Sequence, residues 1–411
     1  MAQATASMSP SRAIPRAAAR GERPRVMVVY QHGSGIGHAS RAEALAAAMS
    51  GQAEVTLVSG GVPIPGREPP RGVDFVQLDP IAWEYRYGAN PRSVSEVPDF
   101  VATSRRRGAQ VLSAVRATRP DAIVFEFYPF GPHRFGGACD PLMRMLPFMK
   151  APPLCFSSLR SRLETLVEGG RAEYGLAREM LPSRFAAVLH HVDPRVFPPD
   201  AMPAEVLQAI GSVPLHATGF VRRRGASLAE APTPRGGLLL CVGGGSTQGA
   251  EWLHRVLDAL PLMRQRAVPV RVVCGPMMPA EARAGLMARV GDGVRIIERA
   301  RDLEGSIASA DAVVSFAGYN TAVEALAQGK PLLLTPKSAF SYEQAENARA
   351  FSDAGLALSL PQEAPPAEIA AALDRVLGFR PAFIPDCSGA KVSADLVIGM
   401  IHRRRSALQS T

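Results

Sequence analysis

The sequence predicts an α/β protein built from two Rossmann-like domains that face each other across a cleft. Three observations support this fold class. The order strand, glycine loop, helix, strand begins at Val26 and begins again at Leu238. Short apolar strands alternate with helical stretches in both halves, as a doubly wound parallel sheet requires. Residues 219–236, rich in Arg, Pro and Gly, suit neither helix nor strand and separate the halves.

Length and composition agree with this organisation. The 411 residues suffice for two or three domains at about 150 residues each. Apolar residues make up 47%, charged residues 20%, and the mean hydropathy is +0.04, which excludes wholesale disorder and a multispan membrane protein. The net charge of +9 is spread through both halves, so nucleic-acid binding is not expected. Five widely spaced cysteines without a Cys-x-x-Cys pair favour a reducing cytoplasm.

These signals divide the chain into five segments. Residues 1–24 are expected to be a disordered tail, since they lack the apolar core of a secretory signal. An N-terminal Rossmann-like domain is expected over 25–218 and a C-terminal Rossmann-like domain over 237–386, joined by the linker 219–236. Residues 387–411 read as a C-terminal helix that could pack back on the N-terminal domain.

Each expected element follows from its local pattern. Short stretches of four or five mostly apolar residues, too short for helices, predict strands. In the first half the expected strands are Val26–Tyr30, Val55–Ser59, Asp74–Leu78 and Ala122–Phe125, and the expected helices are Ala39–Met49 and Phe100–Ala117. In the second half they are the strands Leu238–Val242, Val270–Cys274, Val294–Ile297, Ala312–Ser315 and Pro331–Thr335, and the helix Glu251–Leu260.

The first glycine loop, Gly33-Ser34-Gly35-Ile36-Gly37-His38, follows a strand and opens a helix. It is neither a dinucleotide fingerprint nor a phosphate loop, because its glycine spacing differs from the first and it lacks the Gly-Lys-Ser/Thr of the second. His38 is well placed as a general base, since a free imidazole is mostly neutral at pH 7. A helix-capping or packing histidine is an equally good interpretation of the sequence.

Two further glycine turns open helices in the second half. Gly243-Gly244-Gly245-Ser246 offers backbone N–H groups and a positive helix end, which suit a pyrophosphate. Gly318 lies in a similar turn ahead of Glu324, whose carboxylate could bind the two ribose hydroxyls. Thr321 and Glu324 also match a capping box, as do Ser341 and Gln344, and the spacing alone favours the cap.

The sequence contains few candidate metal ligands at a suitable spacing. It contains no Asp-x-Asp, so a divalent cation beside a nucleotide is not expected, and no cofactor is expected either. His190 and His191 read as core or surface histidines. The Met-rich stretch 142–150 favours core packing over lipid contact. The run 105–107 of three arginines favours a solvated helix face.

Residues 311–360 resemble the family 28 glycosyltransferase C-terminal domain. The match rests on Ser315-Phe316-Ala317-Gly318-Tyr319-Asn320-Thr321-Ala322-Val323-Glu324 and on Glu343-Gln344-Ala345-Glu346-Asn347. Together with Gly35-Ile36-Gly37-His38-Ala39-Ser40-Arg41, it makes the folded chain similar to GT-B glycosyltransferases related to the peptidoglycan N-acetylglucosaminyltransferase.

The resemblance implies a nucleotide-sugar donor in the C-terminal half and an acceptor in the N-terminal half. Glu324 would bind the ribose, Glu343 with Gln344 the donor-sugar hydroxyls, and the two glycine turns the phosphates. Arg299 stands at the base-binding turn, where relatives often carry an aromatic residue. The donor-side residues so indicated are Gly243, Gly244, Gly245, Ser246, Arg299, Ala300, Gly318, Asn320, Thr321, Glu324, Glu343, Gln344 and Asn347.

On the N-terminal side the resemblance implies a catalytic pair. His38 matches the histidine of the first glycine loop, and Glu126 falls where related transferases, more often with Asp, carry an acid that orients the base. Gly35, Gly37 and Arg41 belong to the acceptor-side loop. The related enzymes invert the anomeric centre without a metal.

The expected activity is therefore an inverting, metal-independent transfer from a nucleoside diphosphate sugar, with UDP the expected nucleotide, to an acceptor hydroxyl. The acceptor is a small molecule, a glycan or a lipid-linked compound. The expected location is the cytoplasm, with peripheral contact to the inner membrane face an option. A nucleotide-sugar 2-epimerase of the same architecture and a catalytically silent sugar-nucleotide-binding protein are the alternatives.

Overall fold

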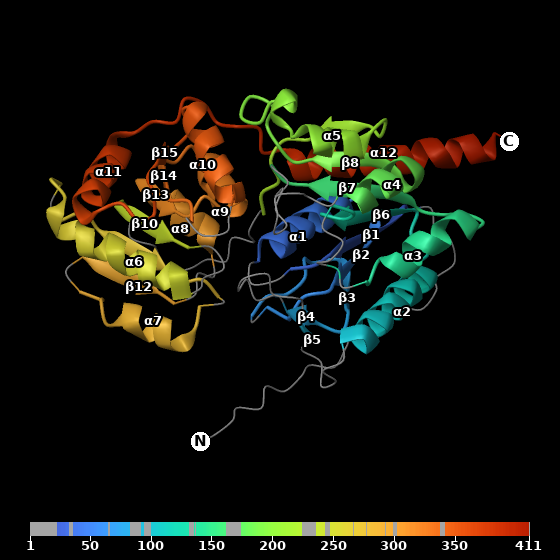
Figure 1. Cartoon of the computed structure of the whole chain (residues 1–411), viewed down its shortest axis with the longest axis horizontal. Helices are drawn as coiled ribbons and strands as arrows, with labels where there is room; N and C mark the ends of the chain where they lie inside the picture. Colours follow the sequence, from blue (N-terminus) through green and yellow to red (C-terminus); the bar gives the residue numbers. More distant parts are fainter. Residues whose placement is uncertain are drawn as a thin grey trace, which may run out of the picture.

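A computed structural model gives the fold. It describes residues 23–32, 36–64, 66–82, 92–93, 100–130, 135, 137–161, 174–223, 236–242, 247–265, 267–276, 278–291, 293–298, 302–337 and 342–410. The chain forms two parallel sheets, each flanked by helices, which confirms the predicted α/β class (Figure 1).

The first sheet has the strand order β3-β2-β1-β6-β7-β8-β9, and all its neighbours pair in parallel. Its strands are β1 Arg25–Tyr30, β2 Glu54–Ser59, β3 Val73–Gln77, β6 Ala122–Glu126, β7 Leu154–Leu159, β8 Phe185–His190 and β9 Leu215–Ala217. The four strands predicted in this half are confirmed within two residues at each end. The strand order reverses between β1 and β6, where open α/β sheets hold their ligands beyond the carboxyl ends of the strands.

The second sheet has the order β12-β11-β10-β13-β14-β15, again with parallel pairing throughout. Its strands are β10 Leu238–Cys241, β11 Val270–Val273, β12 Val294–Ile297, β13 Ala312–Ser315, β14 Leu332–Leu334 and β15 Leu358–Ser359. The five predicted strands of this half are confirmed. The order reverses between β10 and β13, so the second sheet has its own switch point.

Helices cover both faces of each sheet, and their apolar sides form the cores. The helices that flank the first sheet are α1 Gly37–Ser50, α2 Phe100–Thr118, α3 Asp140–Met145, α4 Gly175–Arg184, α5 Ala204–Ile210 and α12 Gly389–Gln409. Those of the second sheet are α6 Thr247–Ala259, α7 Ala280–Met287, α8 Leu303–Ala308, α9 Tyr319–Leu326, α10 Tyr342–Asp353 and α11 Pro366–Gly378. Short 3-10 turns lie at Leu146–Phe148, Pro199–Ala201 and Leu260–Leu262, and β4 Ile81–Ala82 pairs antiparallel with β5 Arg92–Ser93.

The chain crosses between the two domains twice, and the crossings lie side by side. The Phe220 N–H donates to the Asp386 carbonyl oxygen at 2.8 Å, and the Gly389 N–H donates to the Phe220 carbonyl oxygen at 3.1 Å. After the second crossing α12 runs along the N-terminal domain and packs against α1 (Figure 1). The Arg405 guanidinium then pairs with the Asp121 carboxylate at 2.8 Å, which fixes the end of the chain to the first sheet.

A cluster of aromatic rings closes this side of the domain interface. Phe197 and Phe220 each lie 5.8 Å from the Phe351 ring of α10, centroid to centroid. All three side chains are buried, so the segment between β8 and the crossing contributes to the core of the second domain. The two domains are therefore held together by packed apolar surface as well as by polar contacts.

Two sequence-based interpretations change with the structure. Arg107 does not lie on a solvated helix face: it is fully buried, and its guanidinium donates to the Gly60 carbonyl oxygen at 2.8 Å and to the Gln31 side chain at 2.7 Å. The Met-rich stretch 142–150 packs into the core with only part of its residues. Leu142 is buried, whereas Phe148 is 88% exposed. Over the described residues, no helix is long and apolar enough to cross a membrane.

Candidate active site

The switch point of the first sheet brings His38 and Glu126 together. His38 is the second residue of α1, which follows β1, and Glu126 is the last residue of the neighbouring strand β6. His38 Nδ1 lies 3.0 Å from Glu126 Oε1. The helix is capped at Ile36 without a side-chain hydrogen bond, so His38 is not a capping residue.

Both side chains are buried, and their surroundings set their protonation. Burial alone would raise the pKa of Glu126, but the Arg41 charge and the His38 hydrogen bond outweigh it and hold this pKa far below its usual value. Burial lowers the pKa of His38 to about 3, against the opposing effect of Glu126. A neutral imidazole therefore faces a charged carboxylate. Because the carboxylate can only accept, Nδ1 carries the proton, and Nε2 keeps the lone pair that a base needs.

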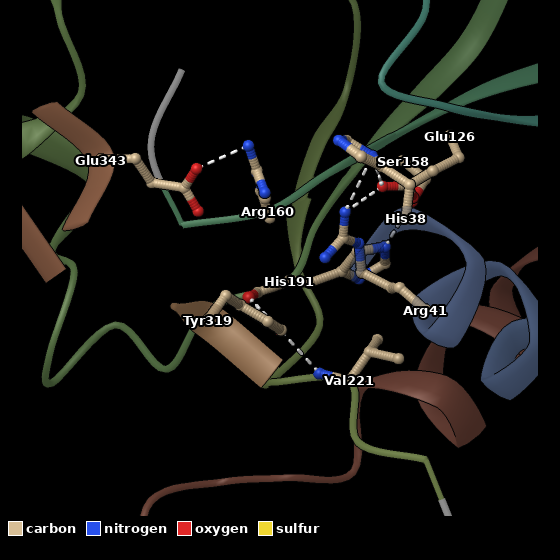
Figure 2. A network of polar contacts seen from close by, with 9 residues as sticks. All are labelled: His38, Arg41, Glu126, Ser158, Arg160, His191, Val221, Tyr319 and Glu343. Carbon is tan, nitrogen blue, oxygen red and sulfur yellow. Dashed lines mark hydrogen bonds and ion pairs between the residues drawn. The ribbon is translucent and has the colours of Figure 1, made fainter. Parts of the chain in front are cut away.

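Arg41 completes this cluster from the next turn of α1. Its Nη2 donates to Glu126 Oε1 and lies 3.3 Å from His38 Nδ1. The centre of its guanidinium lies 5.3 Å from the centroid of the Tyr319 ring, which belongs to α9 of the other domain (Figure 2). Arg41 is only 1% exposed, and its buried Nε and Nη1 have no hydrogen-bond partner among the residues that the structure describes. Unmatched N–H groups on a buried cation indicate that an anion belongs beside it.

A second line of polar groups reaches Glu126 from β7 and β8. The Ser158 hydroxyl donates to Glu126 Oε2 at 2.5 Å, and His191 Nε2 lies 2.9 Å from the same hydroxyl oxygen. His191 Nδ1 lies 2.8 Å from Thr218 Oγ1. The carboxylate is thus held on both oxygens, one by His38 and Arg41 and the other by Ser158 (Figure 2).

The C-terminal domain meets this cluster directly. The Tyr319 hydroxyl donates to the His191 carbonyl oxygen at 2.9 Å and accepts from the Val221 N–H at 2.8 Å. Arg160, just after β7, pairs with Glu343 of α10 at 2.5 Å (Figure 2). A Cβ atom at Gly37 would lie 2.8 Å from Asn320 Nδ2, so glycine allows the starts of α1 and α9 to approach closely.

The predicted donor residues Gly318, Asn320, Thr321 and Glu324 lie at the start of α9. Gly318 caps the helix, and Thr321 is its third residue. The capping-box interpretation of Glu324 is therefore wrong, because Thr321 lies inside the helix rather than at its cap. Among the described residues no hydrogen bond reaches the Glu324 carboxylate. Burial raises its pKa to about 7, against the opposing charge of Arg223.

The other predicted donor residues of the described chain lie on α10. The Asn347 amide oxygen accepts from the Ser161 hydroxyl at 2.8 Å, and its nitrogen donates to the Ala317 carbonyl oxygen at 3.0 Å. Gln344 Oε1 accepts from the Lys337 N–H at 3.1 Å. The remaining predicted positions lie outside the described residues: Gly35, Gly243, Gly244, Gly245, Ser246, Arg299, Ala300 and Ser341. Within the described part of the chain, no group of three or more His, Cys, Asp or Glu side chains could hold a metal ion.

Comparison with known proteins assigns the chain to a family. Residues 239–394 match the glycosyltransferase family 28 C-terminal domain. The chain is 30% identical over 284 residues to the UDP-N-acetylglucosamine–N-acetylmuramyl-(pentapeptide) pyrophosphoryl-undecaprenol N-acetylglucosamine transferase of Methylorubrum extorquens, covering 66% of this chain and 69% of that enzyme. The chain belongs to the family 28 glycosyltransferases.

Solved structures agree on the fold. The glycosyltransferase of kitacinnamycin superposes with a TM-score of 0.58 at 14% identity, over 95% of this chain and 99% of that one. Acinetobacter baumannii MurG superposes with a TM-score of 0.53 at 16% identity, over 92% and 99%. The predicted two-domain GT-B architecture is thereby confirmed. The prediction that the chain is a glycosyltransferase is confirmed by the family match and the Methylorubrum relative.

Sequence reasoning on this family 28 glycosyltransferase assigns no role to four polar residues of the site. These are Ser158, Arg160, His191 and Thr218. The sequence indicates only a core or surface histidine at His191, because no polar partner lies near it along the chain. Its partners come from β7 and from the domain crossing, and they become neighbours only through the order β6-β7-β8. Predicting the two unassigned strands β7 and β8 would have shown that Ser158 and His191 end adjacent strands.

Proposed function

We propose that this glycosyltransferase moves a sugar from a nucleoside diphosphate sugar to an acceptor hydroxyl by a single inverting displacement. The observation that carries the proposal is the His38–Glu126 pair, which lies where the carboxyl ends of the first sheet meet the helix starts of the second. A base on one domain and a helix start on the other, which can bind phosphate through its N–H groups, are what such a transfer requires.

The chemistry follows from the tautomer of His38, whose Nδ1 carries the proton and whose Nε2 carries the lone pair. Nε2 takes the proton of the acceptor hydroxyl as its oxygen bonds to the anomeric carbon of the donor sugar. The bond from that carbon to the diphosphate oxygen breaks, and its electron pair leaves with the diphosphate. Glu126 stabilises the imidazolium that forms, since its charged carboxylate already accepts from Nδ1.

The leaving diphosphate needs positive groups that are in place before the reaction. We assign this role to the N–H groups at the start of α9, which lies against the start of α1, and to those at the start of α6. Arg41 adds a charge from the opposite domain, because among the described residues nothing accepts a hydrogen bond from its Nε or Nη1. These groups supply the neutralisation that a divalent cation provides elsewhere, so we propose that the reaction is metal-independent.

We propose uridine as the base and Glu324 as the ligand of the ribose hydroxyls. The Methylorubrum relative is named for a UDP-N-acetylglucosamine donor, and the fold neighbours include a plant enzyme solved with UDP-2-fluoroglucose. The Glu324 carboxylate, without a hydrogen bond of its own among the described residues, suits two ribose hydroxyls. Glu343, Gln344 and Asn347 would then lie at the donor sugar.

The acceptor and the location are also proposals. The relative's name specifies a pyrophosphoryl-undecaprenol acceptor, which is lipid-linked, whereas two fold neighbours are named for kitacinnamycin and spinosyn. All five cysteines are free, as expected in a reducing cytoplasm. We propose a cytoplasmic enzyme whose exposed Phe148 and Met145 would allow contact with the inner membrane face.

The test is an assay of donor turnover by the full chain. A panel of UDP- and dTDP-sugars is screened by thermal shift, and the sugars that stabilise the protein are incubated with and without candidate acceptors. Release of UDP together with a glycoside of inverted configuration supports the proposal. Conversion of the donor to an isomeric nucleotide-sugar in the absence of acceptor would instead establish an epimerase.

A further inference from the structure

We infer that Thr218, His191 and Ser158 form a one-way hydrogen-bond chain that positions Glu126, and through it the His38 base. The inference rests on the proposed function, since it assigns these three as positioning residues for the base of that reaction. None of the three touches His38 directly. They act on the far oxygen of the carboxylate that His38 uses.

The direction of the chain follows from the number of protons available. Glu126 is a carboxylate and can only accept, so Ser158 gives it its single hydroxyl proton. Ser158 then has no proton left for His191, 2.9 Å away, and must accept there. His191 Nε2 therefore carries a hydrogen. In a neutral ring the other nitrogen is then an acceptor, so Thr218 donates to His191 Nδ1.

The competing arrangement requires a charged His191. The Thr218 hydroxyl also lies 3.1 Å from the Gly219 carbonyl oxygen and 3.3 Å from that of His190. If it donated to either of these, both nitrogens of His191 would have to carry protons. The ring is fully buried, and burial lowers its pKa to about 3, so the neutral form is favoured. The 2.8 Å contact to Nδ1 is also the shortest that Thr218 makes.

The hydrogen-bond chain explains why the Glu126 carboxylate keeps one orientation. Ser158 holds Oε2, which leaves Oε1 turned toward His38 Nδ1 and Arg41. Without the Ser158 hydroxyl, rotation about the terminal bond of Glu126 would cost one hydrogen bond less. His38 would then lose the fixed partner that selects its Nδ1–H form and so keeps the lone pair on Nε2.

The hydrogen-bond chain ends, at Thr218, beside the segment where the polypeptide crosses between the domains. Thr218 directly precedes Gly219, whose segment pairs with Asp386 and Gly389 of the second crossing. The His191 backbone oxygen accepts from the Tyr319 hydroxyl of α9. The residues that position the base are therefore fixed by the contacts that set the two domains against each other.

Variants at Ser158 and His191 separate this role from a structural one. In Ser158→Ala we expect kcat to fall about 10- to 100-fold, the usual effect of losing an outer hydrogen-bond partner, with the donor KM unchanged. His191→Gln puts an N–H group near the position of Nε2 and should retain most of the turnover. His191→Asn puts its amide near Nδ1 and should behave like Ser158→Ala.

Ser157→Ala is the matched control. Ser157 lies on the same strand, is equally buried, and donates one hydrogen bond, to the Tyr128 carbonyl oxygen at 2.8 Å. It should lower the melting temperature about as much as Ser158→Ala and leave kcat unchanged. Equal kcat losses in Ser157→Ala and Ser158→Ala, or in His191→Gln and His191→Asn, would overturn the inference.

Nitrogen-15 NMR of histidine-labelled full-length protein tests the direction without any turnover. The two nitrogen shifts of a neutral ring identify its tautomer, and His38→Ala and His191→Gln assign the signals. We expect Nε2–H for His191 and Nδ1–H for His38 near pH 7. A charged ring or an Nδ1–H form at His191 would refute the proposed direction of the hydrogen-bond chain. Because this readout needs no substrate, it stands even if the proposed transfer reaction is wrong.

Discussion

Removal of the His38 imidazole tests the acid–base step at the scale of one residue. His38→Ala should reduce kcat about 10²- to 10⁴-fold, the usual contribution of a general base, and leave nucleotide affinity nearly unchanged because the proposed donor contacts lie in the other domain. Glu126→Gln should cause a smaller loss of the same kind. Initial rates and calorimetric binding of UDP measure both effects.

The control for this pair is His402→Ala, which removes an exposed histidine of α12. It should change neither rate nor affinity. Near-normal turnover in His38→Ala would show that His38 only packs, and Glu126 would then be the next candidate for the base.

Glu324 allows a prediction about pH that needs no substrate. Burial raises its pKa from 4.5 to about 7 in the folded protein. Between these two pH values the folded state keeps a proton that the unfolded state has lost, so this group lowers the stability of the fold as pH rises through that window. Glu324→Gln should therefore have a higher melting temperature than the wild type above pH 7 and a similar one near pH 4.5. UDP affinity of this variant should be weaker above pH 7, where the wild-type carboxylate is charged, and the difference should shrink as the pH falls below 7.

The outcome separates two roles of the same side chain. If Glu324→Gln melts lower than the wild type at pH 8 and binds UDP normally, Glu324 stabilises α9 and has no role in nucleotide binding. The expected pair of results, greater stability with weaker binding, is typical of a residue kept for function at a cost to the fold.

At the scale of elements, the close approach of α1 and α9 depends on Gly37. A methyl group there would lie 2.8 Å from the Asn320 amide nitrogen, so that side chain or the helix must move. Gly37→Ala should lower kcat/KM for the donor about tenfold, less than the roughly 10² that a displacement of 1 Å can cost, because an amide can rotate away. Steady-state kinetics with varied donor measure the change.

Gly51→Ala serves as the control for this prediction. Gly51 follows the last turn of the same helix in right-handed helical conformation, and a Cβ atom there meets nothing within 4 Å. Its kinetics should match the wild type. If Gly37→Ala matched it too, the contact between the two helix starts would be irrelevant to donor use.

The strands also show which parts of the fold can be predicted from the sequence and which cannot. Short, mostly apolar stretches predict β1, β2, β3 and β6 and most of the second sheet. The strand β7 follows the proline-rich run 151–153 and carries the polar pair Ser157-Ser158 just before its last residue, so its apolar pattern is interrupted. The strand β8 continues directly from α4 without a turn residue, and no local signal marks its start.

The site could be predicted only where its residues share a local motif. His38, Arg41 and the turn at Gly318 stand beside glycines that mark loops between strands and helices. Glu126 was found through the family resemblance rather than through its neighbours. Ser158 and His191 carry no such mark, because their role depends on which strands the fold places side by side.

At the scale of the whole molecule, the proposed reaction needs charges from both domains to neutralise the leaving diphosphate. The cation Arg41 comes from the first domain and the positive helix start of α9 from the second, so in the proposed reaction neutralisation depends on how the two domains are held together. The ion pair between Arg160 and Glu343 is one of the contacts that join the domains beside the site.

This division of charge predicts that activity survives chelation. With EDTA in excess over any bound divalent ion, the full-length enzyme should keep most of its kcat, because the helix starts and Arg41 do the work of the cation. Arg41→Lys, which retains a charge but loses the forked guanidinium, should become more dependent on added Mg²⁺ than the wild type. Complete loss of activity on chelation, restored by Mg²⁺ or Mn²⁺, would contradict the prediction. Modest stimulation by Mg²⁺ would not, since a cation can help the nucleoside diphosphate to dissociate after the sugar has been transferred.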